Sequence, residues 1–276
     1  MRRSWAPILD AATSVVDEYP YRITLRQLHY RLFHLSGLGY RNDPNDYNQL
    51  SSRTAEGRRQ GSFPALVDQT RTVHRPLSWS SPTSALSWTA EVYRRDRTEG
   101  QDHLVVLGAE KDTLRTQFAD WFEELGLPIV LTRGYGSQSY VDEITEMAIT
   151  DGRKAVLLYV GDLDPSGEDI LRDFRTRCDV WSAVEHIAVR EDQIEELHLV
   201  VNPGKPADPR AASFIRRHPD LGLVQVEVEA IAPDDLRRLI TDALARWWDS
   251  TPYEAVLGVE AVERDWLSRL AEDPEP

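Results

Sequence analysis

The sequence predicts an α/β protein in which a small helical module precedes a mostly parallel sheet covered by helices. Two patterns lead to this expectation. Three short stretches with helical apolar spacing, joined by tight turns, occupy roughly the first 60 residues. From residue 101 onward, apolar runs of strand length alternate with helical stretches through short links, an order that produces parallel sheets. A chain of 276 residues has room for both parts.

The helical stretches of the first part are predicted at residues 1–18, 25–35 and about 47–60. Thr24 is a suitable N-cap for the second of them, and Gly37 and Gly39 follow its end. Three such helices match a helix-turn-helix or winged-helix module, which we place at residues 1–76. Residues 77–100 are rich in serine and polar side chains, so we expect a linker there, helical in part around 88–94.

The second part, residues 101–276, contains the predicted parallel sheet and a C-terminal extension. Its expected strands are 104–107, 128–131, 154–160 and 184–189, and its expected helices are 112–125, 138–150 and 166–177. The extension alternates apolar and polar residues over 222–231, which predicts an edge strand, and an amphipathic helix is expected over 233–248.

Composition and charge narrow the classes of function. Hydrophobic residues make up 41%, and the longest purely apolar run, 155–160, is far too short to cross a bilayer. The single cysteine, Cys178, excludes an internal disulfide, so we expect a soluble cytoplasmic protein without membrane partners. The net charge is −14, yet residues 1–100 hold 14 arginines against 10 acidic residues. The basic residues 1–100 are suited to contact phosphate groups. The acidic remainder could keep the protein soluble or bind a cation.

Carboxylates follow two of the predicted strands. Asp162 and Asp164 come directly after the apolar run 154–160, and residues two apart in an extended chain point to the same side. Glu110 follows the strand at 104–107. Since parallel sheets bind ligands at the carboxyl ends of their strands, these three side chains suggest a Mg²⁺ site, with Mn²⁺ as a substitute. The alternative is a strand-to-helix turn in which an aspartate caps the helix.

Tyr30 is the candidate nucleophile of the helical module. On a helical projection of residues 25–35, the leucines form one stripe and Tyr30 lies opposite it, with Arg26 one turn earlier. A phenol oxygen beside a guanidinium could attack a phosphodiester and form a phosphotyrosine. The alternative is a surface tyrosine, or one that packs against the second part of the chain.

These motifs together resemble a known family. The order strand–Gly108-Ala109-Glu110, then an Arg-Gly-Tyr-Gly-Ser loop at 133–137, then strand–Asp162-Leu163-Asp164 is similar to the Toprim domain. The form of the last motif most resembles the A subunit of topoisomerase VI and its meiotic double-strand-break relatives. In that family a Thr/Ser-x-Arg-x-x-aromatic-Tyr pattern precedes Toprim, and residues 24–30 fit it with Tyr30 last. The departure is His29 at the aromatic position.

The resemblance implies a type IIB topoisomerase-like DNA transesterase. Tyr30, assisted by Arg26 and Glu110, would cleave double-stranded DNA, while Glu110, Asp162 and Asp164 would bind Mg²⁺. The family works as a two-fold dimer that makes double-strand breaks, and some members act with a separate ATPase subunit. Such a protein would be associated with the nucleoid. The expected DNA contacts are Arg53, Arg58, Arg59, Lys111 and Arg133.

Two other classes of function remain open on the sequence. One is a Toprim nuclease that hydrolyses DNA with a metal-activated water and no covalent intermediate. The other is a DNA-binding regulator without catalytic activity. The chain has no phosphate-binding loop of its own, because Gly204-Lys205 lacks the glycine that such a motif requires.

Overall fold

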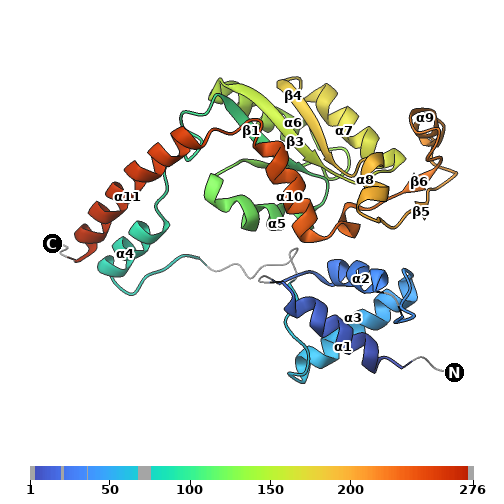
Figure 1. Ribbon diagram of the computed structural model, residues 1–276. Helices are drawn as coiled ribbons and strands as arrows, with labels where there is room; N and C mark the ends of the chain where they lie inside the picture. The colour runs from blue at the N-terminus through green and yellow to red at the C-terminus, as the bar shows by residue number, and fades with distance from the viewer. Residues whose placement is uncertain (1–3, 20–21, 36, 68–75, 273–276) are drawn as a thin grey trace. The chain divides into compact units, whose positions relative to one another are not determined.

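The computed structural model describes residues 4–19, 22–35, 37–67 and 76–272 (Figure 1). The chain divides into two compact units. Unit 1 comprises Met1–Arg71, Asp162–Pro165 and Val189–Leu236, and unit 2 comprises Thr72–Gly161, Ser166–Ala188 and Arg237–Pro276. This division differs from the predicted domains, because residues 162–165 and 189–236 group with the N-terminal helices rather than with the sheet.

A four-stranded parallel sheet forms the centre of unit 2, which confirms the α/β class. Its strands, in the order β2-β1-β3-β4, are β2 (Ile129–Leu131), β1 (His103–Ala109), β3 (Lys154–Val160) and β4 (Trp181–Ala188). β1 and β3 are buried along most of their length, as a sheet covered on both faces requires. Ala109 pairs with Val160, so the two central strands end side by side.

Helices cover the sheet as the alternating pattern predicts. They are α5 (Asp112–Phe122), α6 (Gln138–Asp151) and α7 (Pro165–Arg177), and α10 (Pro233–Leu244) follows later in the predicted extension. Leu104 and Val106 of β1 share one hydrophobic core with Ile144 of α6 and Phe174 of α7. The alternate residues of β1 point to the other face, and α5 packs against β1 and β2. The carboxyl ends of β1 and β3 are therefore held in place by a buried sheet that is well packed against these helices.

Three helices form the N-terminal part of unit 1: α1 (Ala6–Asp17), α2 (Leu25–His34) and α3 (Pro44–Arg59). Their shared core contains Ile8, Leu28, Leu32 and Leu50, each fully buried. Thr24 and Gln27 form a reciprocal capping box at the start of α2. Outside these helices, the β pairing within residues 4–19, 22–35 and 37–67 consists of one isolated bridge between Thr24 and Val67.

The remainder of unit 1 corrects the strand predicted at 222–231. This part contains α8 (Glu191–Glu196), β5 (Asn202–Pro203), α9 (Ala211–Arg217), β6 (Val224–Gln225) and the 3₁₀ turn η2 (Val228–Ala230). The pairing of β6 with β5 ends after Gln225, because the next residue, Val226, exchanges two backbone hydrogen bonds with Leu163 instead, and the N–H of Val228 then donates to the Asp162 carboxylate. The alternation of apolar and polar residues over 222–231 therefore does not indicate a long strand. It reflects individual side chains that point to alternate sides of the segment.

The segment 77–100, which the sequence predicts as a linker that is helical in part around 88–94, has a longer helix that begins earlier. It contains α4 (Pro82–Val92), which begins with a capping box between Ser81 and Ser84. α4 packs along the C-terminal helix α11 (Ser250–Glu272), and this pair of helices extends from the sheet in unit 2 (Figure 1). Sequence patterns near 77–100 could not indicate this packing, since the partner helix lies more than 150 positions away.

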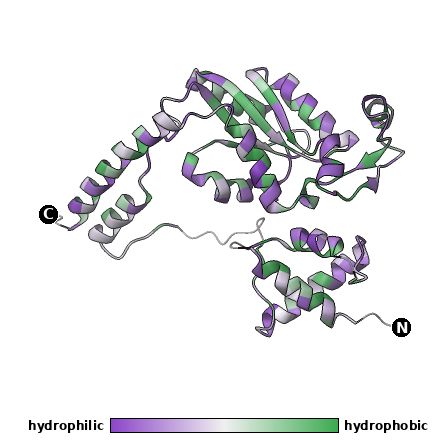
Figure 2. Ribbon diagram, in the orientation of Figure 1, coloured by the Kyte–Doolittle hydropathy of each residue, from purple (hydrophilic) through white to green (hydrophobic). Residues whose placement is uncertain are grey.

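The distribution of hydropathy agrees with this arrangement. Apolar residues concentrate on the strands, while the helices alternate apolar and polar bands (Figure 2). Among the residues that the structure describes, no helix is both long enough and apolar enough to cross a membrane.

Candidate active site

Tyr30 lies on α2 with only 5% of its surface exposed. The helical projection correctly separates it from the leucine core, and of the two alternatives for its surroundings the structure favours packing against the later part of the chain over a surface position. The 3₁₀ turn η2 packs against α2 within unit 1 and covers part of the face that the projection leaves open. Tyr30 still lines a pocket of about 260 Å³, whose other lining residues are Arg26, His29, Asn42, Asp43, Pro44, Tyr47, Asn48 and Glu227.

Arg26 connects Tyr30 to two glutamates that the sequence analysis did not single out. Its guanidinium forms an ion pair with Glu227, and its Nε lies 3.1 Å from Oε2 of Glu229. Glu229 is buried, so this pairing offsets the cost of placing its charge away from water. The two glutamates are two residues apart in the alternating stretch 222–231, which is the signal that could have shown them on one side.

The phenol of Tyr30 is held in its neutral form. Burial raises the pKa of Tyr30 to about 12, and the nearby charge of Glu227 acts in the same direction. Arg26 opposes this shift through its charge and a hydrogen bond to the phenol. Because Arg26 is itself paired with two carboxylates, it lowers the pKa of Tyr30 by less than burial raises it. A phenol in this setting needs a base, or a change in its surroundings, before it can act as a nucleophile.

His29 does not provide that base in this arrangement. Its Nδ1 lies 2.6 Å from the Tyr40 hydroxyl, and its Nε2 lies 3.0 Å from Oδ1 of Asn42. Since an amide oxygen can only accept, Nε2 carries the proton and Nδ1 accepts from Tyr40. Burial also lowers the pKa of His29, which favours the neutral ring. Both ring nitrogens are engaged, so His29 orders this side of the pocket.

The predicted aspartates begin directly after β3. Asp162 is buried, and its Oδ1 accepts a 2.9 Å hydrogen bond from the backbone N–H of Val228. Leu163 forms two backbone hydrogen bonds with Val226, each 3.0 Å long. These contacts hold the 162–164 segment against the stretch that carries Glu227 and Glu229. Asp162 and Tyr30 therefore contact the same short segment of unit 1 from different sides.

Glu110 occupies the end of β1 in unit 2, as the sequence predicts. Its backbone N–H donates to the carbonyl of Val160 over 3.1 Å. Its Oε2 lies only 2.8 Å from the point where a Cβ on Gly161 would stand, and the Tyr159 ring is equally close to that point. Glycine is therefore required at 161 so that the Glu110 carboxylate can lie over the end of β3. This requirement escaped the sequence analysis.

The predicted metal ligands belong to different units: Glu110 to unit 2, and Asp162 and Asp164 to unit 1. Among the described residues, no group of three or more His, Cys, Asp or Glu side chains is arranged to hold a metal ion. Carboxylates at the carboxyl ends of neighbouring strands are nevertheless the donor type that Mg²⁺ prefers.

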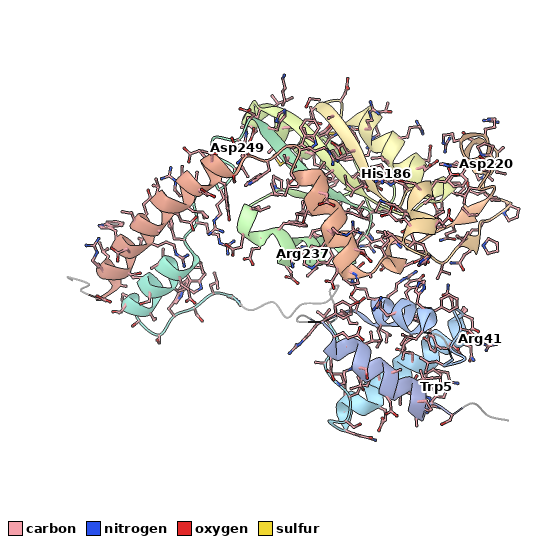
Figure 3. The ribbon with its side chains drawn as sticks, in the orientation of Figure 1. Trp5, Arg41, His186, Asp220, Arg237 and Asp249 are labelled. Atoms are coloured by element: carbon pink, nitrogen blue, oxygen red, sulfur yellow. The ribbon has the colours of Figure 1, made fainter. Side chains whose placement is uncertain are left out.

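The predicted DNA contacts lie on both units. Arg53, Arg58 and Arg59 are exposed on α3 in unit 1, where Arg53 stacks 5.0 Å from the ring centre of Trp5 and Arg59 pairs with Glu56. Arg53 also lines an open pocket of about 640 Å³ with Trp5 and Arg41, both labelled in Figure 3.

In unit 2, Lys111 precedes α5, and the largely exposed Arg133 lies 3.8 Å from Asp112. The structure therefore places three of the predicted cations together on one helix and the other two near the carboxyl ends of β1 and β2.

The fold defines an α/β protein with a four-stranded parallel sheet flanked by helices and with additional N-terminal helices. No known family model matches this chain, and neither does any curated protein.

Proposed function

We propose that this protein cleaves double-stranded DNA by tyrosine transesterification, with Tyr30 as the nucleophile. The observation that carries the proposal is the pairing of Tyr30 with Arg26 on one face of α2, where both line a polar pocket. In the reaction, the Tyr30 oxygen forms a bond to phosphorus while the bond from phosphorus to the 3′ oxygen breaks. The phenol proton passes to solvent, the leaving oxygen gains a proton, and a 5′-phosphotyrosyl end results.

The other residues have supporting roles in this proposal. Glu110, Asp162 and Asp164 would hold Mg²⁺, which would stabilise negative charge on the phosphate. The N-terminal helices would act as a winged-helix module and the sheet as a Toprim domain. The exposed arginines of α3, together with Lys111 and Arg133, would contact the DNA backbone, so binding would weaken steeply as salt increases.

The contacts of Arg26 define one step that must precede cleavage. Its guanidinium now pairs with Glu227 and Glu229, which occupy the positions that phosphate oxygens would take. DNA would therefore have to displace at least one of these carboxylates. The exchange replaces a carboxylate with an equally charged phosphodiester, and the guanidinium then stabilises the additional negative charge that develops on the phosphate as the phenol attacks.

A metal-dependent nuclease without a covalent intermediate is the second candidate. It is favoured by the burial of Tyr30 and by its raised pKa, because a neutral, covered phenol is a poor nucleophile. In this alternative the carboxylates would activate a water molecule, and Tyr30 would only order the pocket.

One experiment distinguishes these functions. Supercoiled plasmid is incubated with the protein and Mg²⁺ or Mn²⁺, then treated with denaturing detergent with and without protease. Transesterification predicts linear DNA with protein bound to its 5′ ends, and Tyr30→Phe abolishes this product. Tyr253→Phe, which alters a tyrosine on α11 in unit 2, outside this pocket, retains it.

Each of the other results selects a different function. Protein-free ends that persist in Tyr30→Phe but vanish in Asp162→Asn identify the nuclease. DNA binding without cleavage under any divalent ion identifies a regulator, provided that purified ATPase partners of the topoisomerase type also fail to elicit cleavage. Either result would overturn the transesterase proposal.

A further inference from the structure

The side of α3 that faces away from the helical core carries amides and hydroxyls in place of charges. Asp46, Leu50 and Thr54 are buried and recur at spacings of four, so they mark the inner side of the helix. Opposite them, four uncharged polar residues fall within an arc of about 100° on a helical projection. These residues, which we call the amide face, are Asn45, Asn48, Gln49 and Ser52.

This composition is not what the exposed side of a stable helix requires. Asparagine and serine are weaker helix formers than the charged residues that usually cover such a side. On α7, for example, Arg172 pairs with Asp169. On the arc of the amide face, charges begin only towards the end of α3, where Arg59 pairs with Glu56. Helix stability therefore does not explain the amides.

The amides of Asn45 and Asn48 are not used inside the protein. The neighbouring Asn42, in contrast, accepts from His29 over 3.0 Å and donates to Oδ1 of Asn202 over 3.4 Å. Across the part of the chain that the structure describes, no comparable contact holds the side chain of Asn45 or Asn48. Both amides thus keep a donor and an acceptor for a ligand from outside.

Arginines lie beside the amide face. Arg53 stacks 5.0 Å from the ring centre of Trp5, and its Nε donates to Oε1 of Gln49 over 3.3 Å. Arg58 and Arg59 are exposed at the C-terminal end of the helix. Guanidinium groups in these positions are suited to the phosphates on either side of a DNA groove, whereas the uncharged amides between them are suited to bases.

The two aspartates at the start of α3 are engaged within unit 1. Asp46 is buried, and its carboxylate accepts a 2.8 Å hydrogen bond from the backbone N–H of Arg41. Asp43 accepts from the backbone N–H of Asp46 over 2.8 Å and lies 3.2 Å from the guanidinium of Arg41, which Figure 3 labels. Between residues 45 and 52, which the structure describes throughout, the amide face presents no carboxylate to repel DNA.

We propose that α3 reads base edges in the major groove of duplex DNA through its amide face. Asparagine and glutamine each carry a donor and an acceptor spaced to pair with the N6 amino group and N7 of adenine. The N-terminal part of a recognition helix makes such contacts in helix-turn-helix modules, and the amides lie in that part of α3. From residue 45 to residue 52 the helix rises about 10 Å, or about three base-pair steps. The preferred ligand is thus a duplex with closely spaced adenines.

The amide face also borders the candidate nucleophile. Asn48 lines the pocket that contains Tyr30 and Arg26, and all three residues belong to unit 1. Base readout by α3 would therefore determine which phosphate is placed beside Tyr30. The inference rests on the proposed function in taking DNA as the ligand, and it adds that cleavage occurs at selected sequences.

The test is selection from a pool of random-sequence duplexes by the full chain, in EDTA so that no metal-dependent cleavage occurs. Wild type is expected to enrich one motif that contains adenines. Gln49→Glu replaces a donor with acceptors, which pair with the N4 amino group of cytosine, so the preference at one position should shift from adenine to cytosine by about tenfold. Gln60→Glu, which adds the same charge at the end of α3 beyond the amide face, should leave the motif unchanged.

Two further variants separate base contacts from phosphate contacts. Gln49→Ala, which adds no charge, is expected to lose the preference at that single position and to keep the rest of the motif. Arg58→Ala is expected to weaken binding to all sequences equally. Circular dichroism should show equal helix content in every variant.

The outcomes distinguish this inference from the proposed cleavage activity. A pool that stays random although wild type binds it would overturn base readout, as would an unchanged motif in Gln49→Glu and Gln49→Ala. Either result leaves transesterification standing, because cleavage does not require sequence preference. A chain that selects a motif but never cleaves retains base readout and loses the transesterase, and a chain that binds no DNA loses both.

Discussion

The guanidinium of Arg26 forms an ion pair with Glu227, a residue 201 positions further along the chain. Arg26 also contacts Glu229, while the residue between these two glutamates, Val228, donates its backbone N–H to Asp162. A single short segment therefore satisfies both the candidate tyrosine helix and one of the candidate metal ligands. Any ligand that takes Arg26 away from the glutamates would also disturb the surroundings of Asp162.

Removal of Arg26 should destabilise unit 1. Arg26→Ala leaves the buried carboxylate of Glu229 next to Glu227 with no compensating charge, so we expect a loss of about 1–2 kcal/mol in the free energy of unfolding. Urea denaturation measures this loss. Arg58→Ala, on the exposed face of α3, is the matched control and should change stability by less than about 0.5 kcal/mol. Adding Glu229→Gln to Arg26→Ala should recover part of the loss, and its failure to do so would contradict this account.

The phenol of Tyr30 should titrate later than an ordinary tyrosine. Folding raises its pKa from 10.0 to about 12, chiefly through burial, so the folded state favours the protonated phenol. Its contribution to stability is complete below pH 10 and is lost as the pH rises towards 12. The difference in ultraviolet absorbance between wild type and Tyr30→Phe should show this late titration. A midpoint near pH 10 would mean that Tyr30 is more accessible to water than the structure indicates.

A methyl group at position 161 should disturb the Glu110 carboxylate. In Gly161→Ala the added Cβ would stand 2.8 Å from Oε2 of Glu110 and 2.7 Å from the Tyr159 ring, so these side chains must move. We expect a loss of about 1–3 kcal/mol in stability and, if Glu110 binds Mg²⁺, weaker Mg²⁺ uptake by calorimetry. Gly136→Ala should be tolerated, because its Cβ makes only an ordinary 3.5 Å contact with Tyr140.

The stability of the packing between α4 and α11 should depend on Glu260 and on pH. The hydrogen bond from Arg97 holds the pKa of Glu260 below the ordinary glutamate range. Its stabilising contribution is therefore complete above that range and is lost as the pH falls through the lowered pKa. Glu260→Gln should destabilise the packing of α4 against α11 by about 1–3 kcal/mol, since it removes the buried partner of Arg97 and leaves only the exposed Glu124 paired with that guanidinium. Faster amide hydrogen exchange in α4 and α11 measures the effect, whereas the exposed Glu91→Gln should leave exchange rates unchanged.

Local patterns in the sequence were sufficient for the sheet and for most of its helices. The apolar runs that became β1 and β3 are flanked by helical stretches, and this order leaves few alternatives to a parallel sheet. The same reasoning placed Glu110 and Asp162 directly after these strands, because strand ends follow from where an apolar run stops. It also separated Tyr30 from the leucine core of α2, since helical periodicity depends only on neighbours along the chain.

Contacts between distant segments decided the rest. The burial of Tyr30 depends on a 3₁₀ turn some 200 positions away. The helix α4 within the predicted linker is packed against α11, which lies at the other end of the sequence. Helical periodicity reports which face of a helix is apolar, but not which segment covers the opposite face. The pairing of Arg26 with Glu227 and Glu229 likewise depends on how the folded chain brings residues 227–229 back to α2. The entropy cost of closing that long loop is met by the contacts of the whole fold, so no local pattern in the sequence indicates it.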